Sequence, residues 1–300
     1  MSAQTSDLTI LKADTSAPSA ERERLLRLRA MHAVKSTVVA SASWEYIACG
    51  RGAETLLILP GLLGIGEMSF DHILAFEGEY RVIVPTYPFA ATTVAQLIEG
   101  IVQVLDAEDI NGAHVLGGSY GGMVAQCFLR RYSNKVSRLI LSHTGGPNPE
   151  RAEKNKKLIT VLRFLPMGMV RVMLRLATRK SLEDALEQRV FWEAYSEEMI
   201  RRLSRADLIA HYQIAVDFDA TSRFTPGDLK DWAGRILILE GDDDPIAEAP
   251  AREALKAFHP QARVHTFRGT GHVASIAKLD EYVSVIQQFL REGTKKDLNA

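Results

Sequence analysis

The chain has 300 residues, of which 36 are basic and 37 acidic, and its formal net charge of -1 creates no field that would attract nucleic acid or an anionic membrane. Hydrophobic residues make up 46% of the chain, which is typical of a soluble protein large enough to hold a core without disulfides or metal. The first residues lack the basic start and continuous apolar stretch that are typical of a signal peptide, and no stretch reaches the ~18 apolar residues of a membrane-spanning helix. The two cysteines, Cys49 and Cys127, have no metal-ligand or redox spacing. We therefore expect a cytoplasmic protein with no transmembrane segment, nucleic-acid partner, metal or cofactor.

The first 35 residues are predicted to form an extension that precedes the main domain. Residues 1–19 are small and polar and predict disorder. In ERERLLRLRAMHAVK, leucines and a methionine recur at helical spacing among arginines, which predicts an amphipathic helix over residues 21–35. The remaining chain is assigned to a core formed by residues 36–145 and 233–300, interrupted by a separate insertion.

Short apolar runs in the core predict the strands of one buried sheet. A hairpin centred on residues 41–43 is followed by six strand candidates, at residues 55–60, 81–85, 113–117, 136–142, 235–240 and 262–267. Helical patterns separate most of them, at residues 68–76, 93–105, 121–131, 248–258 and 273–290. Strands that alternate with helices predict an α/β fold whose central sheet is mostly parallel and is flanked by helices.

Residues 146–232 contain no strand pattern and predict an all-helical cap inserted between two strands of the sheet. The segment from 151 to 180 holds nine basic residues and one acid, with Met169 and Met173 among its apolar side chains. One interpretation is an apolar face on the substrate pocket and a solvated basic face. The other is a basic amphipathic surface that meets a membrane, an anionic substrate or a partner. The next twenty residues hold six acids and one base, which favours neutralisation within the cap.

A nucleophile is indicated by Gly117-Gly118-Ser119-Tyr120-Gly121, which fits the pattern G-x-S-x-G between a predicted strand and a predicted helix. The serine of such a turn is held in a strained conformation that exposes its hydroxyl, and larger side chains two residues away would collide with the strand and helix. Gly122 extends the small-residue zone. The alternative is a glycine-rich turn with an inert serine.

An acid and a base follow in the chain order that this kind of site requires, serine, then acid, then histidine. LILEGDDDP places Asp244 after a strand and just before a proline, where the carboxylate could orient a histidine. Asp242 and Asp243 are interpreted as turn and capping groups, and a metal site in this aspartate run is the rival hypothesis. RGTGHVAS supplies His272 in the loop after the last strand.

The other groups of the predicted site come from backbone N–H groups and from the cap. Tyr120, after the serine, and Leu62, in the loop after the strand at 55–60, are expected to donate the N–H groups of an oxyanion hole. His143 at a strand end and His211 in the cap are candidates for the substrate pocket, together with Met169 and Met173 in the cap.

ILPGLLG, GGSYGG, EGDDDP and GTGH together resemble the α/β-hydrolase superfamily over residues 36–292. Within it, ILAFEGEYRVIVPTYP, GGSYGGMVAQCF and RADLIAHYQ are most similar to the maspardin-type branch. PTYP also lacks the D-x-x-G-x-G pattern of many other relatives. The chain departs from maspardin itself in keeping a histidine in GTGH.

The predicted function is that of a serine hydrolase, which cleaves a small carboxylic ester or related acyl compound through an acyl-enzyme. The same three residues could also serve C–C bond hydrolysis or acyl transfer. A non-catalytic binding or adaptor protein on the same fold is the alternative from another class, suggested by the maspardin-type resemblance. The expected partner is a small molecule, and the sequence leaves a homodimer open.

Overall fold

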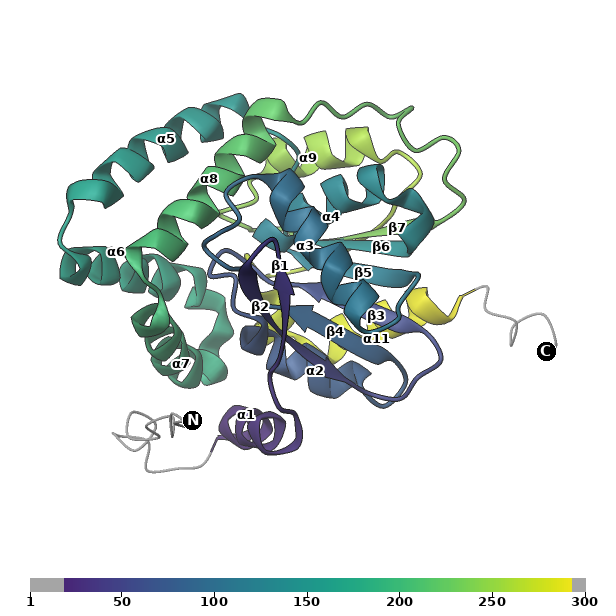
Figure 1. The fold of residues 1–300 in the computed structure, drawn as a ribbon, viewed down its shortest axis with the longest axis horizontal. Coiled ribbons are helices and arrows are strands. Elements are labelled where there is room, and N and C mark those ends of the chain that lie inside the picture. Colours follow the sequence, from purple (N-terminus) through teal and green to yellow (C-terminus); the bar gives the residue numbers. More distant parts are fainter. Residues whose placement is uncertain (1–18, 293–300) are drawn as a thin grey trace.

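The computed structural model describes residues 19–292, so the predicted disorder of residues 1–18 lies outside the described part of the chain. An eight-stranded sheet forms its centre, with helices on both faces (Figure 1). The strand order is β1-β2-β4-β3-β5-β6-β7-β8. The strands are β1 (Lys35–Val39), β2 (Ala42–Cys49), β3 (Thr55–Leu59), β4 (Arg81–Pro85), β5 (Ala113–Gly118), β6 (Val136–Ser142), β7 (Arg235–Gly241) and β8 (Arg263–Phe267).

The predicted mostly parallel sheet is confirmed. β1 and β2 form the antiparallel hairpin expected around residues 41–43, and β2 also runs antiparallel to β4. Every other pairing is parallel. The parallel strands therefore end at a common edge of the sheet, where groups that follow different strands can meet.

Outside the insertion, the described residues form seven α-helices: α1 (Ala20–Met31), α2 (Phe70–Phe76), α3 (Val94–Ala107), α4 (Tyr120–Arg131), α9 (Ala249–Phe258), α10 (Ala274–Ala277) and α11 (Leu279–Arg291). The position of β3 in the sheet explains why its sequence is a continuous apolar run. Leu57 and Leu59 pack into the cluster on the side of α3 and α4, whereas Leu56 and Ile58 pack into the cluster on the side of α2 and α11. Both faces are buried, so both sets of alternating side chains are apolar.

Several boundaries differ from the sequence prediction. Helix α1 ends at Met31 rather than at residue 35, because the chain turns to an extended conformation at His32 and enters the hairpin at Lys35. The helix predicted over residues 273–290 is divided at Lys278, whose backbone leaves the helical region between α10 and α11. The helix predicted over residues 68–76 begins with a 3-10 turn, η2 (Gly66–Ser69).

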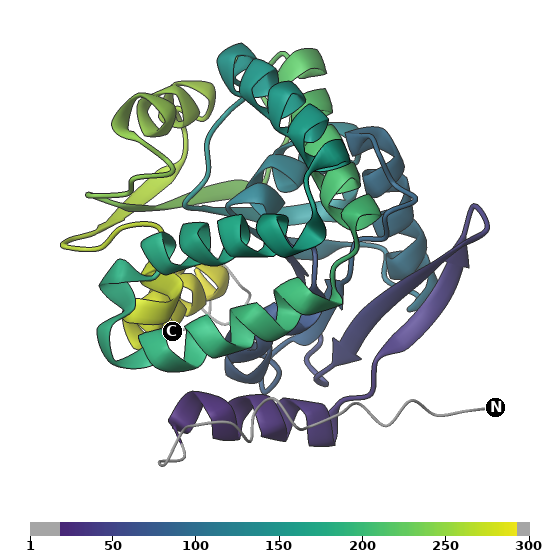
Figure 2. The same ribbon diagram turned by 90° about the vertical axis from the view of Figure 1, so that its left-hand side faces the viewer.

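The helical insertion lies between β6 and β7 and contains α5 (Pro149–Phe164), α6 (Met167–Ser181), the 3-10 segment η4 (Glu183–Gln188), α7 (Arg189–Arg202) and α8 (Arg205–Thr221). No strand interrupts it. Figure 2 shows these helices gathered at one end of the sheet. Leu162 and Val170 pack with Leu63 of the loop after β3. Among residues 19–292, no helix is both long and apolar enough to cross a membrane.

Candidate active site

Ser119 occupies the sharp turn between β5 and α4. Its backbone angles are φ 51° and ψ -115°, a left-handed conformation that costs energy in any residue other than glycine. Two hydrogen bonds hold it in place. The Ser119 N–H donates to the carbonyl of Ser142 at 2.8 Å, and the Thr144 hydroxyl donates to the carbonyl of Ser119 at 2.8 Å.

Gly117, Gly121 and Gly122 around Ser119 have close contacts that leave no room for a side chain. A Cβ atom on Gly117 would lie 2.5 Å from the carbonyl oxygen of Gly121, and one on Gly121 would lie 2.0 Å from the carbonyl oxygen of Leu59. A Cβ atom on Gly122 would lie 2.6 Å from the side chain of Thr144. These distances are below any normal contact, so the predicted reason for the G-x-S-x-G spacing agrees with the geometry of the turn.

Ser119, His272 and Asp244 form a continuous chain of hydrogen bonds. His272 Nε2 lies 2.9 Å from Ser119 Oγ, and His272 Nδ1 lies 2.9 Å from Asp244 Oδ2. The other oxygen, Asp244 Oδ1, accepts the N–H groups of Ile246 and Ala247 at 2.8 Å. The structure thus brings together the three residues that the sequence selected, although they come from the ends of β5, β7 and β8.

The environment keeps Asp244 ionised. Its side chain is fully buried, and burial alone would raise its pKa. The hydrogen bond and charge of His272, with the N–H groups of Ala247 and Ile246, outweigh burial, so the pKa of Asp244 is lowered from its usual value. An ionised carboxylate on Nδ1 orients the imidazole so that Nε2 faces Ser119.

The two neighbouring aspartates have other positions. Asp242 is exposed, and its Oδ1 accepts the N–H of Gly269 at 2.8 Å. This hydrogen bond joins the loop after β7 to the loop after β8. Asp243 is also exposed. Of the three, Asp244 is the one that reaches His272.

The N–H groups predicted for an oxyanion hole belong to Tyr120, the first residue of α4, and to Leu62. Within the described residues neither N–H has a hydrogen-bond acceptor, so both are free to donate. The loop with Leu62 is fixed by Gly64, whose φ is +67° and whose N–H donates to the carbonyl of Gly61 at 2.9 Å. His211 of α8 lies against this loop, since a Cβ atom on Gly64 would be 2.5 Å from its ring.

A family model described as alpha/beta hydrolase fold matches residues 54–279. The chain belongs to the α/β-hydrolase fold family. Over 264 residues it is 26% identical to the 2-hydroxy-6-oxononadienedioate/2-hydroxy-6-oxononatrienedioate hydrolase of Escherichia coli strain K12, a match that covers 81% of this chain and 88% of that protein.

Two solved structures illustrate the shared fold. The enol-lactonase of Burkholderia xenovorans LB400 superposes with a TM-score of 0.73 at 18% identity, covering 86% of this chain and all of that one. A meta-cleavage product hydrolase of Pseudomonas fluorescens IP01 gives a TM-score of 0.67 at 22% identity, covering 87% and 98%. The predicted superfamily and fold class are therefore confirmed, while the maspardin-type branch stays a prediction.

The two histidines proposed for the pocket of this α/β-hydrolase-fold protein are both buried. His143 follows β6, and its ring lies edge-on to that of His272 with 6.0 Å between centroids. Burial, followed by the charge of His272, lowers the pKa of His143 to about 3, so His143 is neutral. Burial also lowers the pKa of His211. The centroid of its ring lies within 6.3 Å of the ring centroids of Tyr87 and Tyr120. Contact of either histidine with a substrate stays a prediction.

The two methionines of α6 that were predicted to line the pocket are exposed. Met169 is 55% exposed and Met173 is 44% exposed. The side of α6 that packs inward carries Val170 and Leu174 instead, because these two residues meet α5, α8 and the loop after β3. A role for the methionines as pocket wall therefore requires an open site.

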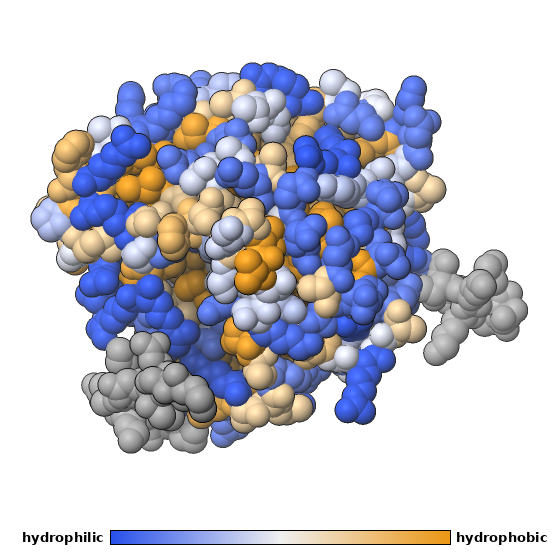
Figure 3. Space-filling model, in the orientation of Figure 1, coloured by the Kyte–Doolittle hydropathy of each residue, from blue (hydrophilic) through white to orange (hydrophobic). Residues whose placement is uncertain are grey.

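Two arginines of α6, Arg175 and Arg179, are paired with acids of the insertion. Arg175 contacts Glu197 at 2.6 Å, and Arg179 contacts Glu193 at 3.3 Å, both acids lying on α7. The expected neutralisation of the basic stretch by the acidic segment is confirmed for these residues. Figure 3 shows that both hydrophobic and hydrophilic side chains are exposed on this face of the insertion.

Two contacts of the site have no signal in the sequence. Thr144, whose hydroxyl donates to the carbonyl of Ser119, lies just after β6. Asp184 of η4 reaches across from the insertion, and its Oδ2 accepts the N–H of Gly271 at 2.7 Å, beside His272. Both pairs are distant in sequence, so neither is visible as a local pattern.

A cavity of about 920 Å³ opens at the opposite end of the sheet from Ser119. It is lined by residues at the starts of parallel strands, among them His114, Arg138 and Arg235. Because Ser119 follows the end of β5, this cavity is separate from the candidate active site.

Proposed function

We propose that the protein is a serine hydrolase that cleaves a small carboxylic ester or related acyl compound. Ser119 Oγ attacks the carbonyl carbon while His272 Nε2 takes the hydroxyl proton, and Asp244 stabilises the imidazolium that forms. The N–H groups of Tyr120 and Leu62 donate to the oxyanion. His272 then protonates the leaving group, and water hydrolyses the acyl-enzyme by the same steps.

One observation carries the proposal: the unbroken hydrogen bonds from Ser119 through His272 to the buried Asp244. A serine hydroxyl is a weak nucleophile until a positioned base accepts its proton. This arrangement favours an enzyme over the non-catalytic adaptor suggested by the maspardin-type resemblance, since binding alone does not need an aligned base. The helical insertion would act as the cap over this site, in a cytoplasmic enzyme.

Two groups support an uncharged substrate, the ion-paired Arg151 of α5 and the neutral His143 beside His272. Arg151 of α5 reaches the carbonyl of Gly146 at 3.0 Å and Met123 of α4. Its guanidinium is already paired with the fully buried Asp219 at 2.6 Å. The cation that α5 brings close to α4 is thus neutralised, and His143 beside His272 is uncharged. A substrate carboxylate beside Arg151 would lose its hydration without gaining a free cation from that residue.

C–C bond hydrolysis is the second candidate, because the Escherichia coli relative is named as a hydrolase of 2-hydroxy-6-oxononadienedioate, a compound without an ester bond, and matches 81% of this chain. That relative's name denotes a substrate with two carboxylates. The chemistry would again require a serine-centred site and water, with a carbon leaving group in place of an alkoxide.

A paired substrate assay tests the proposal. We expect kcat/KM for p-nitrophenyl esters of increasing acyl length to exceed that for 2-hydroxy-6-oxononadienedioate, with both activities lost in Ser119→Ala. Faster turnover of the dienedioate would replace ester hydrolysis by C–C hydrolysis. A protein that turns over neither substrate and leaves Ser119 unlabelled by a fluorophosphonate would favour the adaptor.

A further inference from the structure

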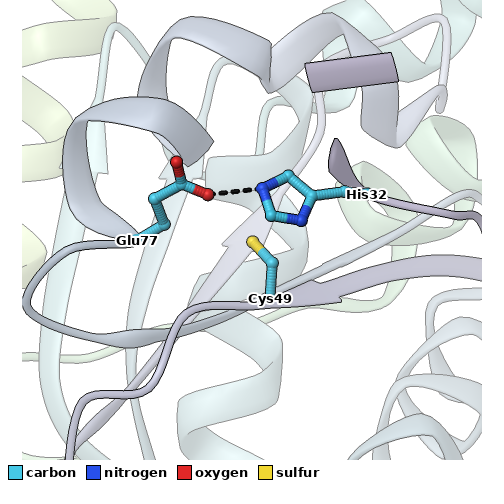
Figure 4. A group of neighbouring side chains, drawn as sticks. All are labelled: His32, Cys49 and Glu77. Atoms are coloured by element: carbon cyan, nitrogen blue, oxygen red, sulfur yellow. Dashed lines mark hydrogen bonds and ion pairs between the residues drawn. The ribbon is translucent and has the colours of Figure 1, made fainter. Parts of the chain in front are cut away.

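A second cluster of chemically active side chains lies away from Ser119, where the N-terminal helix meets the core (Figure 4). His32 follows α1, Cys49 ends β2, and Glu77 follows α2. Their nitrogen, sulfur and oxygen atoms all lie within 4.8 Å of one another. His32 Nε2 and Glu77 Oε2 are 2.5 Å apart.

The three ligand types suit a borderline divalent metal. Zn²⁺ takes thiolate sulfur at about 2.3 Å and imidazole nitrogen or carboxylate oxygen at about 2.0 to 2.2 Å. Ligand atoms of a tetrahedral zinc site are therefore roughly 3.3 to 3.8 Å apart. Small side-chain rotations would bring the three ligand atoms of this cluster to these distances. A thiolate among the ligands disfavours Ca²⁺ and Mg²⁺, which prefer oxygen.

The surroundings of Cys49 also favour a bound metal ion. Its side chain is 9% exposed, and its thiol has no hydrogen-bond partner among residues 19–292. Glu77 directs one oxygen at His32 and leaves the other 3.8 Å from Arg27, a long and weak contact. His32 and Glu77 are slightly open to solvent, so a water molecule could complete four ligands.

We propose that His32, Cys49 and Glu77 bind one Zn²⁺ ion that fixes α1 to the core. On binding, the Cys49 thiol releases its proton to solvent and a Zn–S bond forms. His32 binds through Nε2 as a neutral imidazole, so the proton that Nε2 shares with Glu77 leaves to solvent and the ring holds its one proton on Nδ1. No atom changes its oxidation state. The ion takes the place of the direct hydrogen bond between His32 and Glu77. This metal site was not expected from the sequence, because its three ligands lie on separate elements.

The location gives the ion a structural consequence. Helix α1 also carries Arg29, which contacts both Glu67 of η2 and Glu198 of α7. Fixing the end of α1 would therefore stabilise the contact among α1, the core and the helical insertion. The site shares no residue with the chain of Ser119, His272 and Asp244, so the two proposals can fail independently.

Cobalt substitution tests the site directly. Tag-free full-length protein, stripped with a chelator, is titrated with Co²⁺ while absorbance is recorded. We expect one Co²⁺ per chain, with visible bands of tetrahedral cobalt and a near-ultraviolet thiolate-to-cobalt charge-transfer band that added Zn²⁺ removes. Cys49→Ser should abolish the charge-transfer band, whereas Cys127→Ser, which alters the other cysteine, should keep it.

Absence of the band from the wild type, or its persistence in Cys49→Ser, would overturn the proposal. Because Cys49→Ser could disturb packing, Glu77→Gln provides a second variant that keeps the shape of the side chain. We expect Glu77→Gln to weaken Co²⁺ binding at least 10-fold, the scale seen when metal-site partners are altered, without a change in esterase kcat. Unchanged affinity in a folded Glu77→Gln protein would also count against the site.

Limited proteolysis tests the proposed effect on α1. Trypsin can cut this helix after its four arginines, Arg22, Arg24, Arg27 and Arg29. Added Zn²⁺ should slow these cuts in the wild type and in Cys127→Ser, but not in Glu77→Gln. Equal protection in all three proteins would show that zinc acts elsewhere.

Discussion

The edge of the sheet and the helical insertion are built differently. At the sheet edge Ser119, His272 and Asp244 are each held by several hydrogen bonds, and Asp244 is fully buried. The insertion instead exposes apolar side chains such as Met169 and Phe164, and pairs Arg175 and Arg179 of α6 with acids of α7. This contrast suggests that the core determines the rate of the chemical step and the insertion determines which substrate reaches it.

The largest expected effect on kcat comes from substitutions of the site residues at the sheet edge. Ser119→Ala and His272→Ala should each lower kcat by roughly 10⁵- to 10⁶-fold, because either change removes the same proton-coupled attack. The double variant should be little worse than either single one. Ester hydrolysis and thermal unfolding of all three proteins provide the measurement. If Ser119→Ala kept a tenth of the activity, Ser119 would not be the nucleophile.

The aspartate run offers a test with matched controls. Asp244→Asn should lower kcat by roughly 10⁴-fold, because an amide cannot hold the required tautomer of His272. Asp242→Asn and Asp243→Asn change the same group on exposed neighbours and should retain most activity. Comparable losses at all three positions would place the orienting acid elsewhere.

Substitutions in the insertion should change specificity with a smaller effect. Met169→Ala or Met173→Ala should shift the preferred acyl length, with kcat/KM changing by roughly 10- to 200-fold for the affected esters. Phe164→Ala is the control, since Phe164 is 84% exposed at the corner between α5 and α6. The measurement is kcat/KM across an ester series. An unchanged profile in both methionine variants would remove α6 from the pocket wall.

The smallest effect concerns stability of the core in acid. Burial, followed by the charge of Arg130, lowers the pKa of His259 from 6.5 to about 4. Between these values the unfolded chain binds a proton that the folded chain excludes, so the free energy of unfolding falls as pH falls from 6.5 to 4. In urea titrations, His259→Phe should reduce this slope by up to about 1.4 kcal/mol per pH unit. An unchanged slope would show that His259 is charged in the fold.

The core was largely predictable because its signals are local. Continuous apolar runs such as residues 55–60 reveal strands buried on both faces, and the glycines around Ser119 reveal a turn where larger side chains collide. Asp244 and His272 were found because each follows a strand whose end lies at the same edge of a parallel sheet.

The insertion was less predictable because helical spacing does not say what a helix faces. Val170 and Met169 are neighbours in the same apolar pattern, yet Val170 is buried and Met169 exposed. Contacts between distant segments, such as Asp184 with Gly271, leave no pattern in the sequence. The same limitation hid the cluster of His32, Cys49 and Glu77, which packing of three separate elements creates.

Covalent labelling of the nucleophile tests the central claim most directly. Wild-type protein treated with a fluorophosphonate should gain one adduct per chain, which peptide mass spectrometry should place on Ser119. Ser119→Ala should gain none, and Asp244→Asn should react far more slowly, because the base that activates Ser119 is no longer oriented. An adduct on another residue, or equal labelling of the wild type and Ser119→Ala, would contradict a serine-centred site at the end of β5.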